Sequence, residues 1–371
     1  MTKDDKKRSR IRGCILGAAL GDAIGAPFEF RPADEIEARI GSLWIDGLYP
    51  FTGAVGPHGI WTDAPPIGTG TDDTRYNWLF LELAIELGKM PSDLELAERF
   101  LQVYEQPQAF FPEQYAEHAR GQFAMWEGVC NGRLGRSSKL HPHVPPNVLK
   151  ERSVGLNYPT LIGLIALTSA GLLFPGDPEG AYAAAFQTDF VDIGYARESV
   201  AVLAAGISAM SSREDTPGEL FADLLSLDPL DLGGYFGGPY IKEKLPAFLD
   251  SSPEDCTAPQ LAEYHSRKLG GINPFDPFKT LAIAFSAVRF TPDRPLEAIL
   301  IAANHRGVGE SGHLDRYEDI DCYGCVTGAL AGALAGAEAF PPTLLEQVVD
   351  GNREVYGFDL DDTIRRFSER F

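Results

Sequence analysis

Apolar residues recur at three- and four-residue spacing along much of the chain, and this spacing predicts amphipathic α-helices. The segments concerned are rich in Ala and Leu, which favour the helical conformation. Alternating β-branched stretches of strand length are nearly absent. Pro-, Gly- and Asp-rich stretches at 41–70, 128–157, 229–259 and 306–318 separate the helical segments and are expected to be loops. We therefore expect an all-α fold with long surface loops. The predicted helices cover residues 12–26, 75–87, 94–104, 161–173, 181–186, 198–210, 278–290, 295–304 and 323–339.

The composition does not change along the chain in a way that would mark a linker between domains. We therefore predict a single domain over residues 11–371. Residues 1–10 are polar and are expected to form a disordered tail. They also lack the apolar core of a signal peptide. The longest apolar run, residues 161–174, is shorter than the ~20 residues of a membrane-spanning helix. We expect a cytoplasmic protein that does not bind membranes.

Glycine recurs at every fourth position in two of the predicted helices. The first stripe is Gly13, Gly17, Gly21 and Gly25, and the second is Gly324, Gly328, Gly332 and Gly336. A glycine inside a helix costs about 1 kcal/mol relative to Ala, so repeated glycines need a compensating contact. A glycine stripe lets two helix backbones approach closely. We expect these helices to pack against each other, or against a common neighbour, in the centre of the fold.

The charge of the chain is strongly negative: 32 Lys and Arg stand against 53 Asp and Glu, a net charge of −21. Such a surface repels the phosphates of nucleic acids and of anionic lipids, so bulk binding of nucleic acid is not expected. An anionic small molecule would need local positive charge, such as a bound metal ion.

Two adjacent carboxylates stand in the segment Gly68–Thr74, directly before a predicted helix. Thr71 or Asp72 could cap this helix, and carboxylates favour the positive end of a helix dipole. One cap does not require two carboxylates with flanking hydroxyls, however, and adjacent carboxylates repel each other. Oxygen ligands of this kind are preferred by Mg²⁺ and Ca²⁺. Capping and metal binding both stay open for Thr71, Asp72 and Asp73.

A second acidic pair, Asp319 and Asp321, precedes the second striped helix, and Glu29 follows the first. This pair could again be a helix cap. If the striped helices pack antiparallel, the end of the first lies near the start of the second, and Glu29 approaches both aspartates. Three converging acids are unfavourable unless cations lie among them. A metal cluster is the economical explanation.

Three other sequence features carry only weak evidence of function. The segment Phe358–Thr363 has the D-x-D-x-T spacing of haloacid dehalogenases but lacks a preceding strand, so we expect the Asp-capped start of a C-terminal helix. Cys322 and Cys325 form a C-x-x-C without the second pair of a zinc site, and are expected to be small buried thiols. The histidines show no H-x-x-x-H spacing and are expected mostly at the surface.

Three stretches together are similar to the motifs of one protein family. They are Gly13–Glu29, Gly70–Thr74, and Asp319–Asp321 with the Gly-Ala-Leu-Ala-Gly-Ala run that follows it. Gly171–Pro178 also resembles the central loop of that family. In these motifs and their order, over nearly its whole length, the chain resembles the ADP-ribosylglycohydrolases, which include the dinitrogenase reductase-activating glycohydrolases.

This resemblance implies an orthogonal helix bundle with a site for two Mg²⁺ ions, or Mn²⁺. By position in the motifs, it assigns metal ligation to Thr71, Asp72, Asp73, Asp319 and Asp321. It assigns catalytic roles to Glu29 and Asp73. The implied reaction is hydrolysis of the glycosidic bond that joins ADP-ribose to an acceptor, a protein side chain or a small molecule. Metals would hold the ribose hydroxyls, while carboxylates stabilise an oxocarbenium-like centre and activate water.

The chain departs from the family pattern at the last motif. The family usually has Thr or Ser after the second aspartate, where the hydroxyl is a ligand; here Cys322 stands in that place, and a thiol suits Mg²⁺ poorly. Residues 305–318 are inserted before Asp319, and this polar loop could reshape or cover the pocket. Two other functions stay open: a binding or structural protein that has lost catalysis, and a hydrolase of another nucleoside-type ligand.

Overall fold

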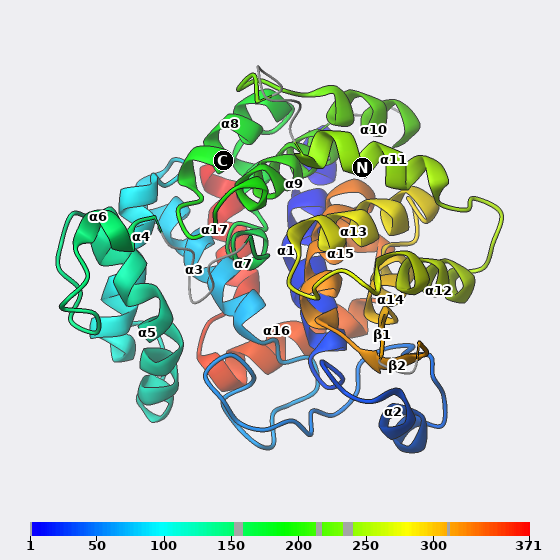
Figure 1. Ribbon diagram of the computed structural model, residues 1–371, viewed down its shortest axis with the longest axis horizontal. Helices are drawn as coiled ribbons and strands as arrows, with labels where there is room; N and C mark the ends of the chain where they lie inside the picture. The colour runs from blue at the N-terminus through cyan, green and yellow to red at the C-terminus, as the bar shows by residue number, and fades with distance from the viewer. Residues whose placement is uncertain (1, 152–158, 213–216, 233–239, 310–311) are drawn as a thin grey trace.

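The two glycine-striped segments form long helices, α1 (Lys3–Gly25) and α15 (Ile320–Ala335), which lie side by side at the centre of the fold (Figure 1). The computed structural model describes residues 2–151, 159–212, 217–232, 240–309 and 312–371. Within these residues the chain forms α-helices, a few short 3-10 helices and one two-stranded sheet. The predicted single all-α domain is confirmed.

The contact between α1 and α15 is made backbone to backbone. A Cβ atom placed on Gly17 would lie within 3.0 Å of the carbonyl oxygen of Gly328, and one placed on Gly21 would meet the carbonyl of Gly324 in the same way. Because the facing glycines run in opposite directions along the sequence, the helices are antiparallel. The close packing predicted from the stripes is confirmed, and it brings the end of α1 to the start of α15.

The first helix begins earlier than expected. Residues 3–10, expected as a disordered tail, are the first turns of α1. Thr2 and Asp5 form a capping box: the Thr2 hydroxyl accepts from the Asp5 backbone N–H at 3.1 Å, and the Asp5 carboxylate accepts from the Thr2 N–H at 2.9 Å. Lys7 Nζ then donates to the carbonyl of Phe371 at 2.7 Å, which ties this end to the C-terminus.

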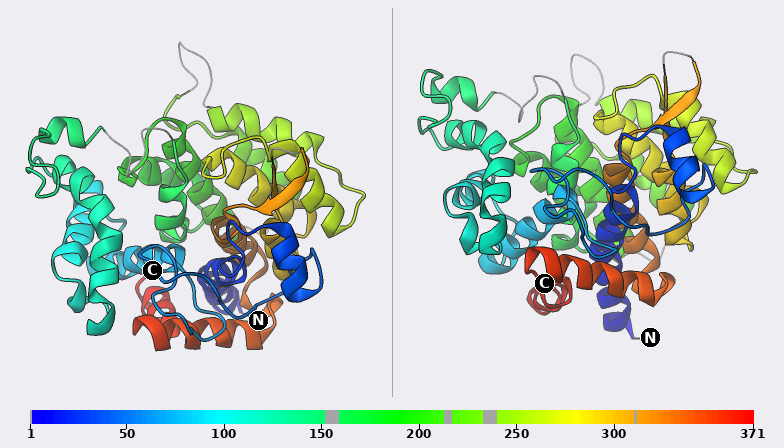
Figure 2. Two further views of the ribbon diagram at one scale, coloured as in Figure 1. Left: turned by 60° about the horizontal axis from the view of Figure 1, so that its bottom comes forward. Right: turned by 90° about the horizontal axis from the view of Figure 1, so that it is seen from below.

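The remaining helices surround the central pair. They are α2 (Ala33–Ile40), α3 (Asp72–Leu87), α4 (Asp93–Glu105), η1 (Pro107–Ala109), η2 (Glu113–Tyr115), α5 (Ala116–Arg133), α6 (Pro146–Leu149), α7 (Ile162–Ala166), η3 (Ala170–Leu173), α8 (Pro178–Thr188), α9 (Tyr195–Ser212), α10 (Pro217–Ser226), α11 (Tyr240–Ser251), α12 (Ala258–Leu269), α13 (Pro277–Phe290), α14 (Pro295–Ala303), η4 (Ala337–Ala339), α16 (Pro342–Tyr356) and α17 (Leu360–Arg370). Helix α16 crosses the direction of α1 steeply (Figures 1 and 2), as in an orthogonal bundle.

Several predicted helices lie within the observed ones, whereas two helices that contain Gly or Pro overlap segments expected to be loops. The predictions for 75–87 and 278–290 lie within α3 and α13. The expected loop at 229–259 instead contains α11, which holds Pro246 in its interior. Helix α5 carries glycine at three internal positions and overlaps the expected loop at 128–157. In these segments, burial of an apolar face outweighs low intrinsic helix propensity.

The helix predicted over 161–173 is broken in the structure. It forms the short helix α7 and the 3-10 helix η3. The Thr168 hydroxyl donates to the carbonyls of Leu164 and Ile165, and the Ser169 N–H donates to the side chain of Asn77. These side-chain bonds compete with the helical ladder. The break places residues 160–165 beside the start of α3.

The inserted segment contains a small β-hairpin, made of β1 (Arg306–Val308) and β2 (Leu314–Tyr317), which pair antiparallel. Figure 2 shows this hairpin beside α2. The Tyr317 N–H donates to the carbonyl of Arg31 at 2.9 Å, and the Phe30 N–H donates to the carbonyl of Glu318 at 3.1 Å. The insertion therefore braces the segment that follows α1 against the segment that precedes α15.

The C-terminal motif is a helix start, as predicted. Asp359 caps α17, and its carboxylate accepts from the N–H groups of Asp361 and Asp362.

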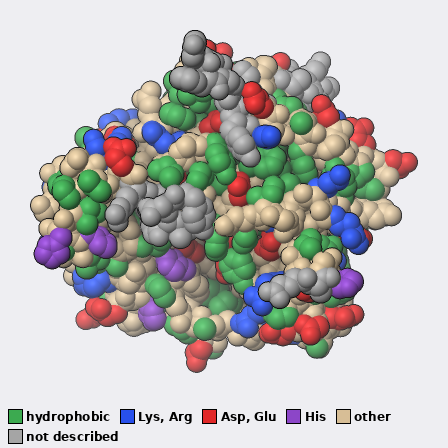
Figure 3. All heavy atoms as spheres, viewed as in Figure 1, with side chains coloured by type: hydrophobic (Ala, Val, Ile, Leu, Met, Phe, Trp, Pro, Cys, Tyr) green, Lys and Arg blue, Asp and Glu red, His purple; other side chains and the backbone are tan. Residues whose placement is uncertain are grey.

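No helix among the described residues is long and apolar enough to cross a bilayer. On the face drawn in Figure 3, Lys and Arg side chains are scattered among acidic and hydrophobic ones.

Candidate metal centre and active site

The end of α1 and the starts of α3 and α15 border a cavity of about 310 Å³. Its acidic lining consists of Glu29, Asp72, Asp73, Asp319 and Asp321, with Cys322 beside them. None of the described residues that line this cavity is Lys or Arg. The three motifs predicted to converge do so here, in a place where the protein supplies little positive charge of its own.

A buried aspartate on α1 shapes the start of α3. The Asp22 carboxylate accepts from the backbone N–H groups of Thr71 at 2.8 Å and Thr74 at 3.1 Å, and from the Thr71 hydroxyl at 2.9 Å. These bonds satisfy donors that the first turn of a helix leaves free. Burial raises the pKa of Asp22 to about 6. Asp22 was not among the predicted site residues, although a carboxylate inside a glycine-striped apolar helix was a visible signal.

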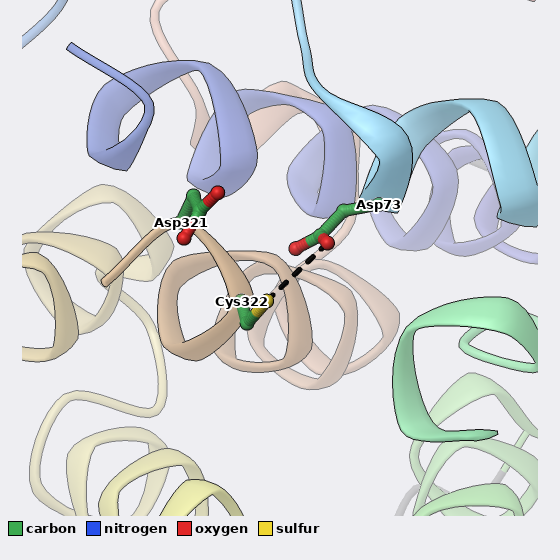
Figure 4. Close-up of side chains that lie close together, drawn as sticks. All are labelled: Asp73, Asp321 and Cys322. Atoms are coloured by element: carbon green, nitrogen blue, oxygen red, sulfur yellow. Dashed lines mark hydrogen bonds between the residues drawn. The ribbon is translucent and has the colours of Figure 1, made fainter. Parts of the chain in front are cut away.

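Two groups of donor atoms form around the cavity. Glu29, Asp319 and Asp321 each place one ligand atom within 4.8 Å of the others, and so do Asp73, Asp321 and Cys322. Figure 4 shows Asp321 and Cys322 at the start of α15, facing Asp73 at the start of α3. Because Asp321 belongs to both groups, they adjoin each other.

Three carboxylate oxygens in these groups lack a hydrogen-bond partner within the described part of the chain: Asp73 Oδ2, Asp319 Oδ2 and Asp321 Oδ1. All three side chains are buried, with 3% exposure or less. Burial first, and then the neighbouring acids, raise the pKa of each carboxyl well above its ordinary value. Burial likewise raises the pKa of Glu29 to about 7. Burial of a carboxylate oxygen without a hydrogen-bond partner costs free energy. A bound cation would offset this cost, so the residues fit a metal centre.

The other two predicted ligands lie nearby in different surroundings. The Thr71 hydroxyl lies 3.5 Å from Asp321 Oδ2 while it donates to Asp22. Asp72 lies outside both donor groups, and its Oδ2 is 3.2 Å from Nδ1 of His58. A hydrogen bond to Asp72 raises the pKa of His58. His58, expected at the surface, is half exposed as predicted, and it also lines the cavity.

An apolar wall completes the cavity, and the sequence analysis missed it. The rings of Phe30 and Phe275 meet edge to face with centroids 5.6 Å apart. Leu161, Ile162 and Ile165 also line the cavity. These residues come from loops and from the broken helix, so no periodic pattern marked them. Such a wall suits the flat or apolar parts of a ligand.

A model of one family, described as ADP-ribosylglycohydrolase, matches residues 3–371. The chain belongs to the ADP-ribosylglycohydrolase family. A search of curated proteins finds no match. The resemblance drawn from the three motifs is thus confirmed, and as a member of this family the chain has its helical fold. Membership indicates hydrolysis of glycosidic bonds in ADP-ribose conjugates as the reaction class.

Proposed function

We propose that this protein is a metal-dependent hydrolase that cleaves the glycosidic bond between ADP-ribose and an acceptor, a protein side chain or a small molecule. One observation carries the proposal: acidic groups from three distant motifs meet at one cavity, with three buried oxygens left unpartnered in the described structure. Family membership supports the reaction class. We also propose a cytoplasmic location and, from the net charge of −21, no bulk binding of nucleic acid.

The proposed metal ligands are Thr71, Asp72, Asp73, Asp319 and Asp321. Two Mg²⁺ or Mn²⁺ ions would supply the positive charge that holds ribose hydroxyls and a diphosphate against this acidic floor. Asp22 supports the proposed ligands, because its hydrogen bonds fix the start of α3, where Thr71 and Asp73 lie.

We assign proton transfer to Glu29, whose carboxyl lines the cavity and lies within 4.8 Å of Asp319 and Asp321. In the proposed reaction, water attacks the anomeric carbon of the ribose and gives a proton to Glu29. The bond from that carbon to the acceptor breaks, and the acceptor leaves with the proton that Glu29 passes on to it. Asp73 faces the positive charge that develops on the sugar.

The test measures free ADP-ribose released from ADP-ribosylated proteins and small conjugates, with Mg²⁺, with Mn²⁺ and with a chelator. We expect the chelator to abolish release. Asp321→Asn should lower the rate at least about 100-fold, because a bound metal supplies several kcal/mol of transition-state stabilisation. Asp293→Asn is the matched control, since that side chain is 85% exposed on the surface. Chelator-resistant release, or an active Asp321→Asn protein of unchanged helicity, contradicts the proposal.

A second function is favoured by Cys322, which stands where the family motif has a hydroxyl ligand. In this alternative the protein binds an ADP-ribose-type ligand without cleaving it. Calorimetry with free ADP-ribose, with and without Mg²⁺, separates the two: tight metal-dependent binding with no release from any conjugate supports the binding protein. Turnover that free ADP-ribose does not inhibit points instead to a different nucleoside-type substrate.

A further inference from the structure

The proposed reaction gives no task to Cys322, although its thiol lies at the cavity. The side chain is buried at 6% exposure, in the first turn of α15. Its Sγ lies 3.3 Å from Asp73 Oδ1, along the dashed line in Figure 4. Asp321 completes a group in which one donor atom of each residue lies within 4.8 Å of the others.

The unpartnered oxygens mark this group independently of the cysteine. Asp73 Oδ2 and Asp321 Oδ1 have no hydrogen-bond partner in the described structure, and their side chains are 0% and 3% exposed. The cavity lining that the structure describes contains no Lys or Arg that could compensate them. A cation bound between these residues would satisfy both oxygens at once.

The two donor groups differ in chemistry. Glu29, Asp319 and Asp321 offer only carboxylate oxygens, which suit Mg²⁺ and Mn²⁺. Asp73, Asp321 and Cys322 offer two carboxylates and a sulfur, and a thiolate favours borderline and softer divalent ions such as Zn²⁺. Mg²⁺ has little affinity for sulfur, so it gains from only two of the three donors there.

We infer that the centre is selective by position: the group of Asp73, Asp321 and Cys322 binds a thiolate-accepting divalent ion of the Zn²⁺ class, and the oxygen-only group binds Mg²⁺ or Mn²⁺. This inference rests on the metal dependence of the proposed function but not on the reaction itself. On binding, the thiol loses its proton to solvent and the sulfur becomes a ligand. The competing interpretation is that Cys322 keeps its proton and only donates a hydrogen bond to Asp73.

Cobalt as a probe distinguishes these interpretations in the full-length protein. After chelator treatment, Co²⁺ is added and the near-ultraviolet absorption is recorded, because a thiolate bound to Co²⁺ gives a sulfur-to-metal charge-transfer band. We expect the band in the wild type and in Cys325→Ser, and its loss in Cys322→Ser. Cys325 is the matched control, because it is an equally buried cysteine one turn further along α15 and outside the donor group.

Metal selectivity gives a second readout. The dissociation constants for Zn²⁺ and Mg²⁺ are measured by competition with a chromophoric chelator and by the metal-induced rise in Tm. Changes next to metal ligands weaken binding about 10–100-fold, so loss of a ligand in Cys322→Ser should weaken Zn²⁺ binding by at least about 10-fold. Mg²⁺ binding should stay equal or improve, since a serine hydroxyl is an oxygen donor.

Each outcome decides the inference. Bound Co²⁺ without the charge-transfer band in the wild type overturns it, as does an unchanged preference for Zn²⁺ over Mg²⁺ in Cys322→Ser. If Cys322→Ser does not fold, two measurements on the wild type still decide between thiolate and thiol. They are the Co²⁺ spectrum and the protection that bound Zn²⁺ gives Cys322 against an alkylating reagent. A thiolate band without release of ADP-ribose supports this inference and contradicts the proposed function. Release of ADP-ribose with Mg²⁺ but without a thiolate band supports the proposed function and contradicts this inference.

Discussion

Glu318 and Asp319 are consecutive in the chain and both are buried, yet their surroundings are opposite. The Glu318 carboxylate pairs with Lys279, which is fully buried and also donates to the carbonyl of Ile272. His305 Nε2 lies 3.1 Å from the same carboxylate. Burial pushes the pKa of Glu318 up, but its contacts with His305 and Lys279 more than offset this and hold it below its ordinary value.

Asp319, by contrast, faces Glu29 and has an oxygen without a partner in the described structure. Burial and the charge of Glu29 raise the pKa of its carboxyl well above the ordinary value. The fold thus pairs Glu318 with a cation of its own, whereas no Lys or Arg among the described residues lines the cavity beside Asp319. The comparison separates a carboxylate that holds the fold together from one that the fold keeps available for a ligand.

The largest expected change in the free energy of unfolding follows removal of the Lys279 ammonium group. Lys279→Met keeps a side chain of similar length but leaves Glu318 buried without its ammonium partner, and breaking such a pair costs about 3–5 kcal/mol. Urea denaturation should show this loss in the free energy of unfolding. In the double variant with Glu318→Gln we expect much of the stability to return. A loss below about 1 kcal/mol in the single variant would show that this pair does not stabilise the fold.

A third pair of buried carboxyls, Asp189 and Asp192, predicts a pH dependence. Burial raises the pKa of Asp189 to about 6 and that of Asp192 above its ordinary value. The folded state therefore holds these protons more tightly than the unfolded chain. The stabilisation from Asp189, on the order of 3 kcal/mol, is complete below pH about 4 and is lost as the pH rises through about 6.

Stability against pH, compared between the wild type and Asp189→Asn, isolates this contribution. The variant should lose part of the slope between pH 4 and 6. Equal slopes would mean that Asp189 titrates alike in both states. The Asp192 carboxylate accepts from the Thr160 hydroxyl and the Gly163 N–H, both at 2.7 Å, so this pair also supports the wall of the cavity.

A smaller change in the free energy of unfolding, of opposite sign to that of Lys279→Met, is expected on substitution of Asp319. In metal-free protein, Asp319→Asn removes a buried acid that has one oxygen unpartnered in the described structure and faces Glu29, so the free energy of unfolding should rise by about 1 kcal/mol. The variant should also lose most of the stabilisation that Mg²⁺ gives the wild type, which is about 2.7 kcal/mol at 100 times the Kd. Thermal unfolding with and without metal measures both. A destabilised metal-free variant would mean that Asp319 serves the fold rather than a cation.

The smallest effect is expected for an exposed pair. Arg267 and Glu263 lie one helical turn apart on α12, with an N–O distance of 2.6 Å and side chains 65% and 48% exposed. Glu263→Gln should change the free energy of unfolding by less than about 0.5 kcal/mol, because water screens the pair. Salt titration of the wild type provides the control. A large effect here would mean that an exposed ion pair stabilises this fold as the buried pair of Lys279 and Glu318 does.

The sequence was informative where the signal is local. Glycine at every fourth position predicted the close packing of α1 and α15, and antiparallel packing in turn brings Glu29 to Asp319 and Asp321. These features could be predicted because helical periodicity and chain direction determine them.

Features that depend on distant partners were missed. Asp22 fixes a loop 49 residues away in the sequence, and His58 reaches Asp72 from an irregular loop. His265 and His305, expected in surface loops, are fully buried, and burial lowers the pKa of His305 to about 4. No periodic pattern reports which loop side chain meets which helix, because tertiary packing decides it.

The pairing of α1 with α15 has a consequence for biosynthesis. Its two halves are separated by about three hundred residues, so nearly the whole chain must leave the ribosome before the contact can form. Asp73 is made early, but Asp319, Asp321 and Cys322 join it only when about the last seventh of the chain docks. The proposed metal centre would therefore be complete only when synthesis is nearly finished, and metal loading would report that the two ends of the chain have met.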